Sequence, residues 1–188
     1  MEGRGTNIPV RRRQKVTDIS NQVVNVVKEA IKLEINGRAF FNHAAEVTHN
    51  ELGKKMFLRL AQDEIRHLAS FAQLFSVVIG GEEWKKFVDQ EKLKGESPLI
   101  EELKSRVKKE KRASELEAIS IGMELERKAI DFFEKSAKET TDPQAKEIFD
   151  RICEEERLHY ELLQAQYDSV TNSGFWLDVA EFRMDGKF

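Results

Sequence analysis

Apolar residues recur every three or four positions along most of this chain, which is the spacing of an amphipathic α-helix. One such pattern runs from about Ser20 to Val47, and a second runs from beyond Asn50 to the glycine pair that begins at Gly80. A glycine pair is a good helix terminator. Because only a short pause separates the two patterns, we expect two helices that form an antiparallel hairpin.

A second pair of helices is predicted in the other half of the chain. Ser114 and Glu117 have the spacing of a capping box, so a third helix opens there. Asp142 and Pro143 suit the N-cap and the first position of a fourth helix, which continues to about Val170. The short turn between these helices predicts a second antiparallel hairpin.

The whole sequence is therefore expected to form one all-α domain, a four-helix bundle over residues 20–170. Its hairpins are 20–80 and 114–170, joined by a charged crossover, 81–113, that is long enough to run the length of the bundle. The crossover would place the second and third helices in parallel, and the segment from Ser97-Pro98 onward is a candidate for a helix of its own.

The two ends of the chain differ in composition. The basic segment 1–19 is expected to be a mobile, solvated tail, although it could instead dock an acidic partner. The segment 171–188 carries Phe175, Trp176 and three further large apolar residues. A segment this apolar is expected to pack on the bundle or on a partner subunit, in a homodimer or small homo-oligomer.

The two hairpins are copies of one another. When the chain is shifted by 92 residues without gaps, 11 of the 46 positions in 30–75 are identical to those in 122–167, where about three matches would arise by chance. The Glu-x-x-His pair Glu64 and His67 falls on a second such pair, Glu156 and His159. A third pair at that spacing, Glu46 and His49, falls on lysine and threonine and is set aside.

The repeat also fixes the height of these residues in the bundle. Glu34 falls on Glu126, and each of these residues lies as far before its turn as Glu64 or Glu156 lies after it. The distance from the turn is about 22 Å at 1.5 Å per residue. Residues three apart share a helix face, so six side chains should converge at mid-bundle. They are Glu34, Glu64, His67, Glu126, Glu156 and His159.

Four carboxylates brought together inside a bundle repel one another and lose their hydration. Two divalent cations would offset their four charges, with both imidazoles neutral. Carboxylate oxygens with one imidazole per metal suit iron or manganese better than zinc, which favours tetrahedral nitrogen and sulfur sites. The set also matches the known ligand pattern of ferritin-like di-iron bundles. We therefore expect two metal ions, iron or alternatively manganese or a mixed pair.

The segments "KLEINGRAFFNHAAE" with "LAQDEIRHL", and "ELERKAIDFFEKSA" with "ICEEERLHYELL", resemble the paired half-site segments of rubrerythrins, within the ferritin-like superfamily. The resemblance covers about 20–170. It implies a non-haem di-iron site that reacts with hydrogen peroxide or dioxygen. It also implies that the four glutamates and two histidines are ligands, with Glu64 and Glu156 as the bridging carboxylates.

Two features depart from typical rubrerythrins. Ala129 stands where those proteins carry an additional glutamate, three residues after the ligand of the third helix. The chain also has one cysteine, Cys153, and so lacks the cysteine-ligated iron domain that delivers electrons. An electron donor would have to be a separate protein. Specialised peroxidase activity is thereby less firmly implied than a di-iron centre.

Three functions remain open from the sequence. They are peroxide or dioxygen reduction as part of oxidative-stress defence, ferrous-iron oxidation for storage or detoxification, and a non-catalytic helical module with a structural metal. A net charge of −3 gives no case for binding to nucleic acid or to membranes. The N-terminus lacks the apolar stretch of a secretory signal, so the expected location is the cytoplasm.

Overall fold

The computed structural model describes residues 10–78, 86, 101, 105–106 and 111–178. These residues form a bundle of four long helices and contain no strand, which confirms the predicted fold class. None of the described helices has the length and apolar character needed to cross a membrane. The helices are α1 (Val10–Val47), α2 (Glu51–Val78), α5 (Lys111–Glu139) and α6 (Pro143–Ser173).

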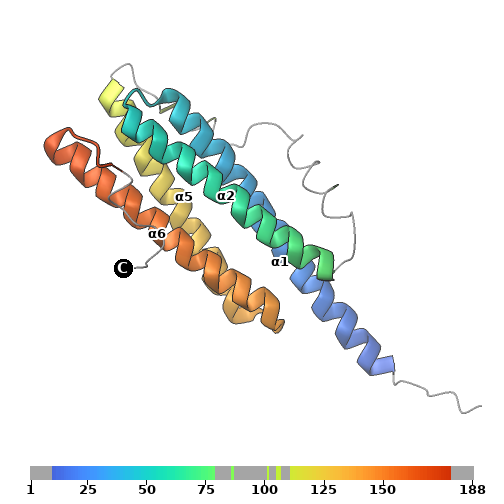
Figure 1. Ribbon diagram of the computed structural model, residues 1–188. Helices are drawn as coiled ribbons and strands as arrows, with labels where there is room; N and C mark the ends of the chain where they lie inside the picture. The colour runs from blue at the N-terminus through green and yellow to red at the C-terminus, as the bar shows by residue number, and fades with distance from the viewer. Residues whose placement is uncertain (1–9, 79–85, 87–100, 102–104, 107–110, 179–188) are drawn as a thin grey trace, which may run out of the picture.

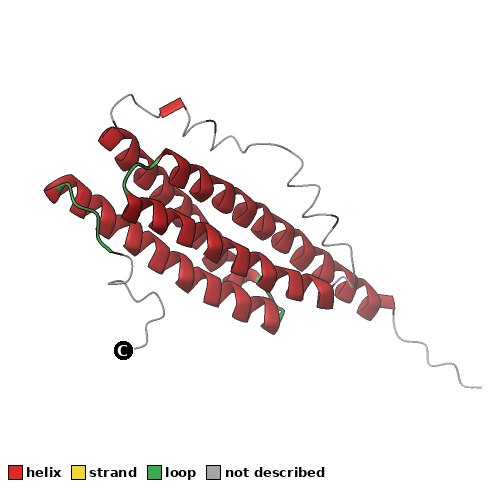
Figure 2. Cartoon of the chain, turned by 45° about the horizontal axis from the view of Figure 1, so that its top comes forward, coloured by secondary structure: helices red, strands yellow, loops and turns green. Residues whose placement is uncertain are grey.

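The helices pair as two antiparallel hairpins, α1 with α2 and α5 with α6, which pack side by side (Figure 1). α2 and α5 run in the same direction, as the sequence predicted (Figure 1). Most of the predicted crossover, 81–113, lies outside the described residues, including most of the segment considered as a further helix, and its last three residues belong to α5. Figure 2 shows the loops of the described chain gathered at the ends of the bundle.

The first helix begins ten residues earlier than the apolar pattern indicated, at Val10 rather than near Ser20. The added residues include Arg11, Arg12, Arg13 and other strong helix formers. Intrinsic propensity extends a helix even where no apolar face continues. As a result, the start of α1 projects beyond the ends of the other helices (Figure 1).

The turns of the two hairpins are capped in the same way. Asn50 Oδ1 accepts hydrogen bonds from the backbone N–H groups two and three residues later, at 2.9 and 3.3 Å. Asp142 Oδ1 does the same at 3.0 and 2.9 Å, and Pro143 stands at the start of α6. Each cap satisfies backbone donors that would otherwise be unpaired at a helix start. These two caps occupy equivalent positions in the repeat.

The apolar core is divided into two clusters along the bundle axis. One cluster contains Phe41 and Phe57 near the first turn, and the other contains Phe71, Phe133 and Phe149 toward the opposite end. In the second cluster, Phe71 of the first hairpin stacks on Phe133 of the second, with ring centroids 5.8 Å apart. The polar residues discussed below lie between the two clusters in sequence on each helix, so each hairpin is apolar on both sides of them.

The described part of the C-terminal segment packs on its own bundle. α6 ends at Gly174, which adopts the left-handed conformation that favours glycine, with φ 78°. Trp176 then covers Gly53 on α2, and its ring meets Phe57 edge to face at 6.3 Å. The buried Gln166 side chain binds the Leu177 backbone in both directions, at 2.9 and 3.0 Å. Residues 179–188 of the predicted apolar tail lie outside the described residues.

Candidate metal centre

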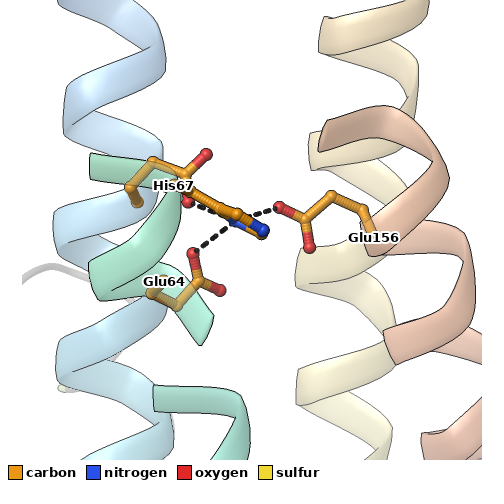
Figure 3. A group of neighbouring side chains, drawn as sticks. Glu64, His67 and Glu156 are labelled. Carbon is orange, nitrogen blue, oxygen red and sulfur yellow. Dashed lines mark hydrogen bonds and ion pairs between the residues drawn. The ribbon is translucent and has the colours of Figure 1, made fainter. Parts of the chain in front are cut away.

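The six side chains singled out by the repeat meet in the middle of the bundle. Each helix contributes: α1 supplies one glutamate, α5 supplies one glutamate, and α2 and α6 each supply a glutamate and a histidine. All six are at most 3% exposed. Figure 3 shows the His67 ring between Glu64, from its own helix, and Glu156, from across the bundle. The six side chains that meet are those of Glu34, Glu64, His67, Glu126, Glu156 and His159.

These side chains form two overlapping groups of four. One group consists of Glu34, Glu64, His67 and Glu156, and the other consists of Glu64, Glu126, Glu156 and His159. Within each group, one potential ligand atom from every residue lies within 4.8 Å of all the others. Glu64 and Glu156 belong to both groups. Two ions bound here would therefore share two carboxylates, and each would have one glutamate and one histidine of its own.

Both imidazole rings turn the same nitrogen toward the carboxylates. His67 Nδ1 lies 3.0 Å from Glu34 Oε2 and 3.1 Å from Glu156 Oε1. His159 Nδ1 lies 2.9 Å from Glu156 Oε2 and 3.5 Å from Glu126 Oε1. The rings stack with centroids 5.8 Å apart. With both Nδ1 atoms facing inward, one imidazole is available to each group of carboxylates.

Burial makes this collection of charges unfavourable in the absence of a cation. Burial raises the pKa of Glu34, Glu64 and Glu126, and the neighbouring carboxylates raise that of Glu64 further. Burial would also raise the pKa of Glu156, but hydrogen bonds from His159 and His67 lower it below its ordinary range. Burial would lower the pKa of His67, but the Glu34 charge and hydrogen bonds to carboxylates raise it above its ordinary range.

The donor set fits two divalent cations. Glu34 Oε1 and Glu126 Oε1 accept no hydrogen bond from the described residues, although His159 Nδ1 lies 3.5 Å from the second of them. Glu34 belongs to the first group and Glu126 to the second. A cation bound in either group would give the unpaired oxygen of that group a partner. Buried carboxylates that lack partners are costly, and coordination to a metal removes that cost. The residues present are thus compatible with a site for two metal ions.

The residues set aside on the basis of the repeat lie away from this centre. The Glu46 side chain is 75% exposed and pairs with His43 on the same helix at 3.3 Å. His49 is exposed at the first turn, where its backbone N–H donates to Glu115 at 2.8 Å. The Glu-x-x-His spacing alone therefore does not place a residue in the centre.

Two further carboxylates next to the centre were not predicted from the sequence. Asp63 Oδ2 lies 3.4 Å from His159 Nε2, and Glu155 Oε2 lies 3.2 Å from His67 Nε2. Both residues directly precede a shared glutamate, and the 92-residue shift superimposes one on the other. Both halves of the repeat carry an acidic residue at this position, and that shared feature could have identified the two residues from the sequence.

Comparison with known proteins assigns the chain to a family. The rubrerythrin family model matches residues 25–167, which include α2, α5, most of α1 and α6, and every residue of the centre. No curated protein and no solved structure matches the chain. The match spans most of the sequence and agrees with the bundle, the internal repeat and the buried carboxylate–histidine cluster. The chain belongs to the rubrerythrin family.

Proposed function

We propose that this protein is a di-iron oxidoreductase that reduces hydrogen peroxide or dioxygen, in the manner of rubrerythrins. The observation that carries the proposal is the pair of overlapping buried groups that share Glu64 and Glu156. A single structural metal would need only one such group. Two neighbouring ions that share ligands are suited to chemistry in which two electrons are transferred together.

In this proposal each residue has a defined role. Glu34 and His67 would bind one ion, Glu126 and His159 would bind the other, and the two shared glutamates would bridge them. When bound, the iron pair would polarise the oxidant and supply two electrons. The carboxylates would balance the metal charge, and the phenylalanine clusters at either end would keep bulk water out. These clusters include Phe41, Phe57, Phe71, Phe133 and Phe149.

Iron is the proposed metal because the donors are mainly carboxylate oxygens, with one imidazole for each ion. This combination suits iron and manganese, whereas zinc favours four-coordinate sites rich in nitrogen and sulfur. Cys153 is buried and donates to the Ile130 carbonyl at 3.7 Å, so it is not part of the centre. Electrons to restore the reduced state would come from a separate donor protein.

Metal loading is the first test. Protein loaded with ferrous iron under anaerobic conditions should bind two ions per chain, and Glu64→Ala and Glu156→Ala should impair this binding to a similar extent. Glu46→Ala is the matched control, since it removes a glutamate of the same motif at an exposed position. Saturation at one ion or none in the unmodified protein would refute the two-metal function.

The choice of oxidant is the second test. Ferrous-loaded protein should be oxidised faster by hydrogen peroxide than by dioxygen at matched concentrations, as followed by stopped-flow absorbance of ferric iron. Ala129 bears directly on this outcome, because typical rubrerythrins have a glutamate at that position. Faster oxidation by dioxygen would favour an oxidase or ferroxidase, and absence of oxidation would favour a structural metal.

A further inference from the structure

The ligand side chains of the candidate metal centre are closed off from solvent. All six are at most 3% exposed, and they come from both hairpins. A metal ion can therefore enter or leave only while the helices around the centre have moved apart. Folded proteins make such movements by local opening, which needs less free energy than global unfolding. The contacts that join the two hairpins decide where this opening takes place.

At the end of the bundle away from the first turn, stacked rings inside the core join the hairpins. Between ring centroids, Phe71 of α2 lies 5.8 Å from Phe133 of α5 and 6.0 Å from Phe149 of α6. All three rings are fully buried. Separation of the hairpins at this end would expose three large aromatic side chains to water, which is costly. This end is therefore suited to be the pivot of an opening movement.

The end near the first turn is joined in a different way. Its core rings belong to the first hairpin, where Phe41 contacts both Phe40 and Phe57. Among the described residues, Trp176 supplies the ring from the second half of the chain that meets them, 6.3 Å from Phe57. Trp176 lies in the segment that follows α6, at the same end of the bundle as the turn between α1 and α2 (Figure 2). The aromatic contact between hairpins is thus peripheral here, and aliphatic side chains complete the cluster.

Trp176 occupies a notch that the glycine at position 53 provides. A Cβ atom at Gly53 would lie 2.6 Å from the Trp176 ring, closer than real side chains allow. The segment that carries Trp176 is anchored on α6, because the buried Gln166 side chain binds the N–H and the carbonyl of Leu177 at 3.0 and 2.9 Å. If the hairpins part, the segment stays with α6 and the Trp176 ring leaves α2.

A second peripheral contact closes the same end. Glu115 of α5 accepts hydrogen bonds from the backbone N–H groups of His49 and Asn50 at the first turn. This contact joins a side chain to a turn, so it can break without disrupting a hydrogen bond inside a helix. Both ties at this end can therefore be released while each hairpin remains intact.

We propose that Trp176, seated on Gly53, is a latch that controls the passage of metal ions. When it releases, the hairpins open at the first-turn end about the stack of Phe71, Phe133 and Phe149, and the ligands become accessible. This inference rests on the proposed two-metal function and adds a means of access to it. Since the latch contains no ligand, it governs how fast ions exchange rather than which ions the closed centre holds.

The test measures the release of Zn²⁺, a redox-inert probe, from full-length protein to an excess of a chromogenic chelator. Trp176→Ala and Gly53→Ala should each release Zn²⁺ about tenfold faster than the unmodified protein, because loss of the contact lowers the free energy of local opening. Gly53→Ala is the sharper variant, since it displaces the ring without removing an apolar side chain. Leu74→Ala is the control and should leave the rate unchanged, because it removes a 2% exposed side chain from the cluster at the other end.

Hydrogen exchange of the metal-free protein provides a readout that does not depend on metal. Backbone amides from Asn50 to Phe57 should exchange faster in both latch variants, while those around Phe71 should not. The latch is overturned if Zn²⁺ release and exchange are unchanged in both variants, or if Leu74→Ala accelerates release as much as they do. Failure of the unmodified protein to bind two ions would instead overturn the proposed function, and the exchange pattern would then still decide whether this end of the bundle opens.

Discussion

Gly37 lies on α1 directly beside the Glu64 carboxylate. A Cβ atom at this position would be 2.7 Å from Glu64 Oε1, closer than real side chains allow. The equivalent residue in the repeat is Ala129, so the two halves differ at this point. The absence of a side chain at Gly37 gives the Glu64 carboxylate its room, which makes this glycine part of the proposed metal centre although it offers no ligand.

Gly37→Ala should therefore weaken metal binding while favouring the helix itself. Replacing glycine by alanine inside a helix adds up to about 1 kcal/mol of stability, but the new methyl group must displace the Glu64 side chain. We expect a lower affinity for Mn²⁺ in calorimetry without a matching loss in the free energy of unfolding of the metal-free protein. Gly122→Ala is the control, because its Cβ would meet Leu163 and Phe41 rather than a carboxylate. Equal Mn²⁺ affinity in Gly37→Ala and the unmodified protein would contradict this reading.

At the scale of helices and turns, the end of the bundle near the first turn is tied together by two contacts between hairpins. Glu115 of α5 accepts hydrogen bonds from the backbone N–H groups of His49 and Asn50, at 2.8 and 3.0 Å. Trp176, which follows α6, packs on Gly53 and Phe57 of α2. Both contacts join the second hairpin to the first at the end of the bundle near the first turn, away from the candidate metal centre.

Trp176→Ala should destabilise the bundle without removing any ligand. Truncation of a buried tryptophan costs about 3–5 kcal/mol, and Trp176 is 7% exposed. The loss should appear as a lower urea midpoint in the metal-free protein, with two metal ions still bound under native conditions. Phe175→Ala is the neighbouring control, since Phe175 is 75% exposed and should change stability little. Equal effects of the two substitutions would show that the Trp176 contact contributes nothing.

The spacing of apolar residues and the cap signals allowed the four helices to be predicted. The repeat allowed the set of six converging side chains to be predicted, because equal distances from two turns put residues at one height. Other features depend on information outside such patterns. The contacts of Asp63 and Glu155 depend on how the hairpins face each other, and the partner of Trp176 is a glycine on a distant helix. The early start of α1 reflects propensity without an apolar pattern.

For the molecule as a whole, the buried charges predict that the stability of the metal-free form falls as the pH rises, while the stabilisation by bound metal grows. The pKa values of Glu34, Glu64 and Glu126 are raised by burial, and those of His67 and His159 are raised by the carboxylates around them. A group whose pKa is raised on folding holds its proton more tightly in the folded state. Its contribution to stability is therefore lost as the pH rises.

The metal-free protein should accordingly be more stable at pH 5 than at pH 8, since ordinary glutamate and histidine pKa values are about 4.3 and 6.5. Glu156 shifts in the other direction, and its contribution is lost only in more acidic solution. Metal binding displaces protons, so the gain in melting temperature on adding Mn²⁺ should grow with pH. Thermal unfolding across this range would measure both trends. Glu64→Gln, which removes one titrating group, should reduce the slope of the metal-free form.

Association of the chain with itself is also expected, as a homodimer or small homo-oligomer. Leu58, Ile65 and Leu158 are exposed on the outer faces of α2 and α6. Mass measurement in solution would determine the assembly, and Leu58→Ser combined with Leu158→Ser should favour the monomer. A monomer in the unmodified protein would refute the expectation, and a large shell would instead indicate iron storage.

The fusion of two hairpins in one chain has a consequence for the order in which the centre fills. Two identical hairpins would give two identical metal positions, whereas fused copies are free to diverge. Here the position of Arg66 in the first hairpin is occupied by Leu158 in the second. The equivalent carboxylates also differ in burial, because the Asp63 side chain is 1% exposed and the Glu155 side chain is 32% exposed. The His159 position is thus backed by a buried carboxylate and the His67 position by a partly exposed one. In the proposed two-metal centre, successive ions should meet unequal sites, with the first ion held beside His159 and the second the more readily exchanged.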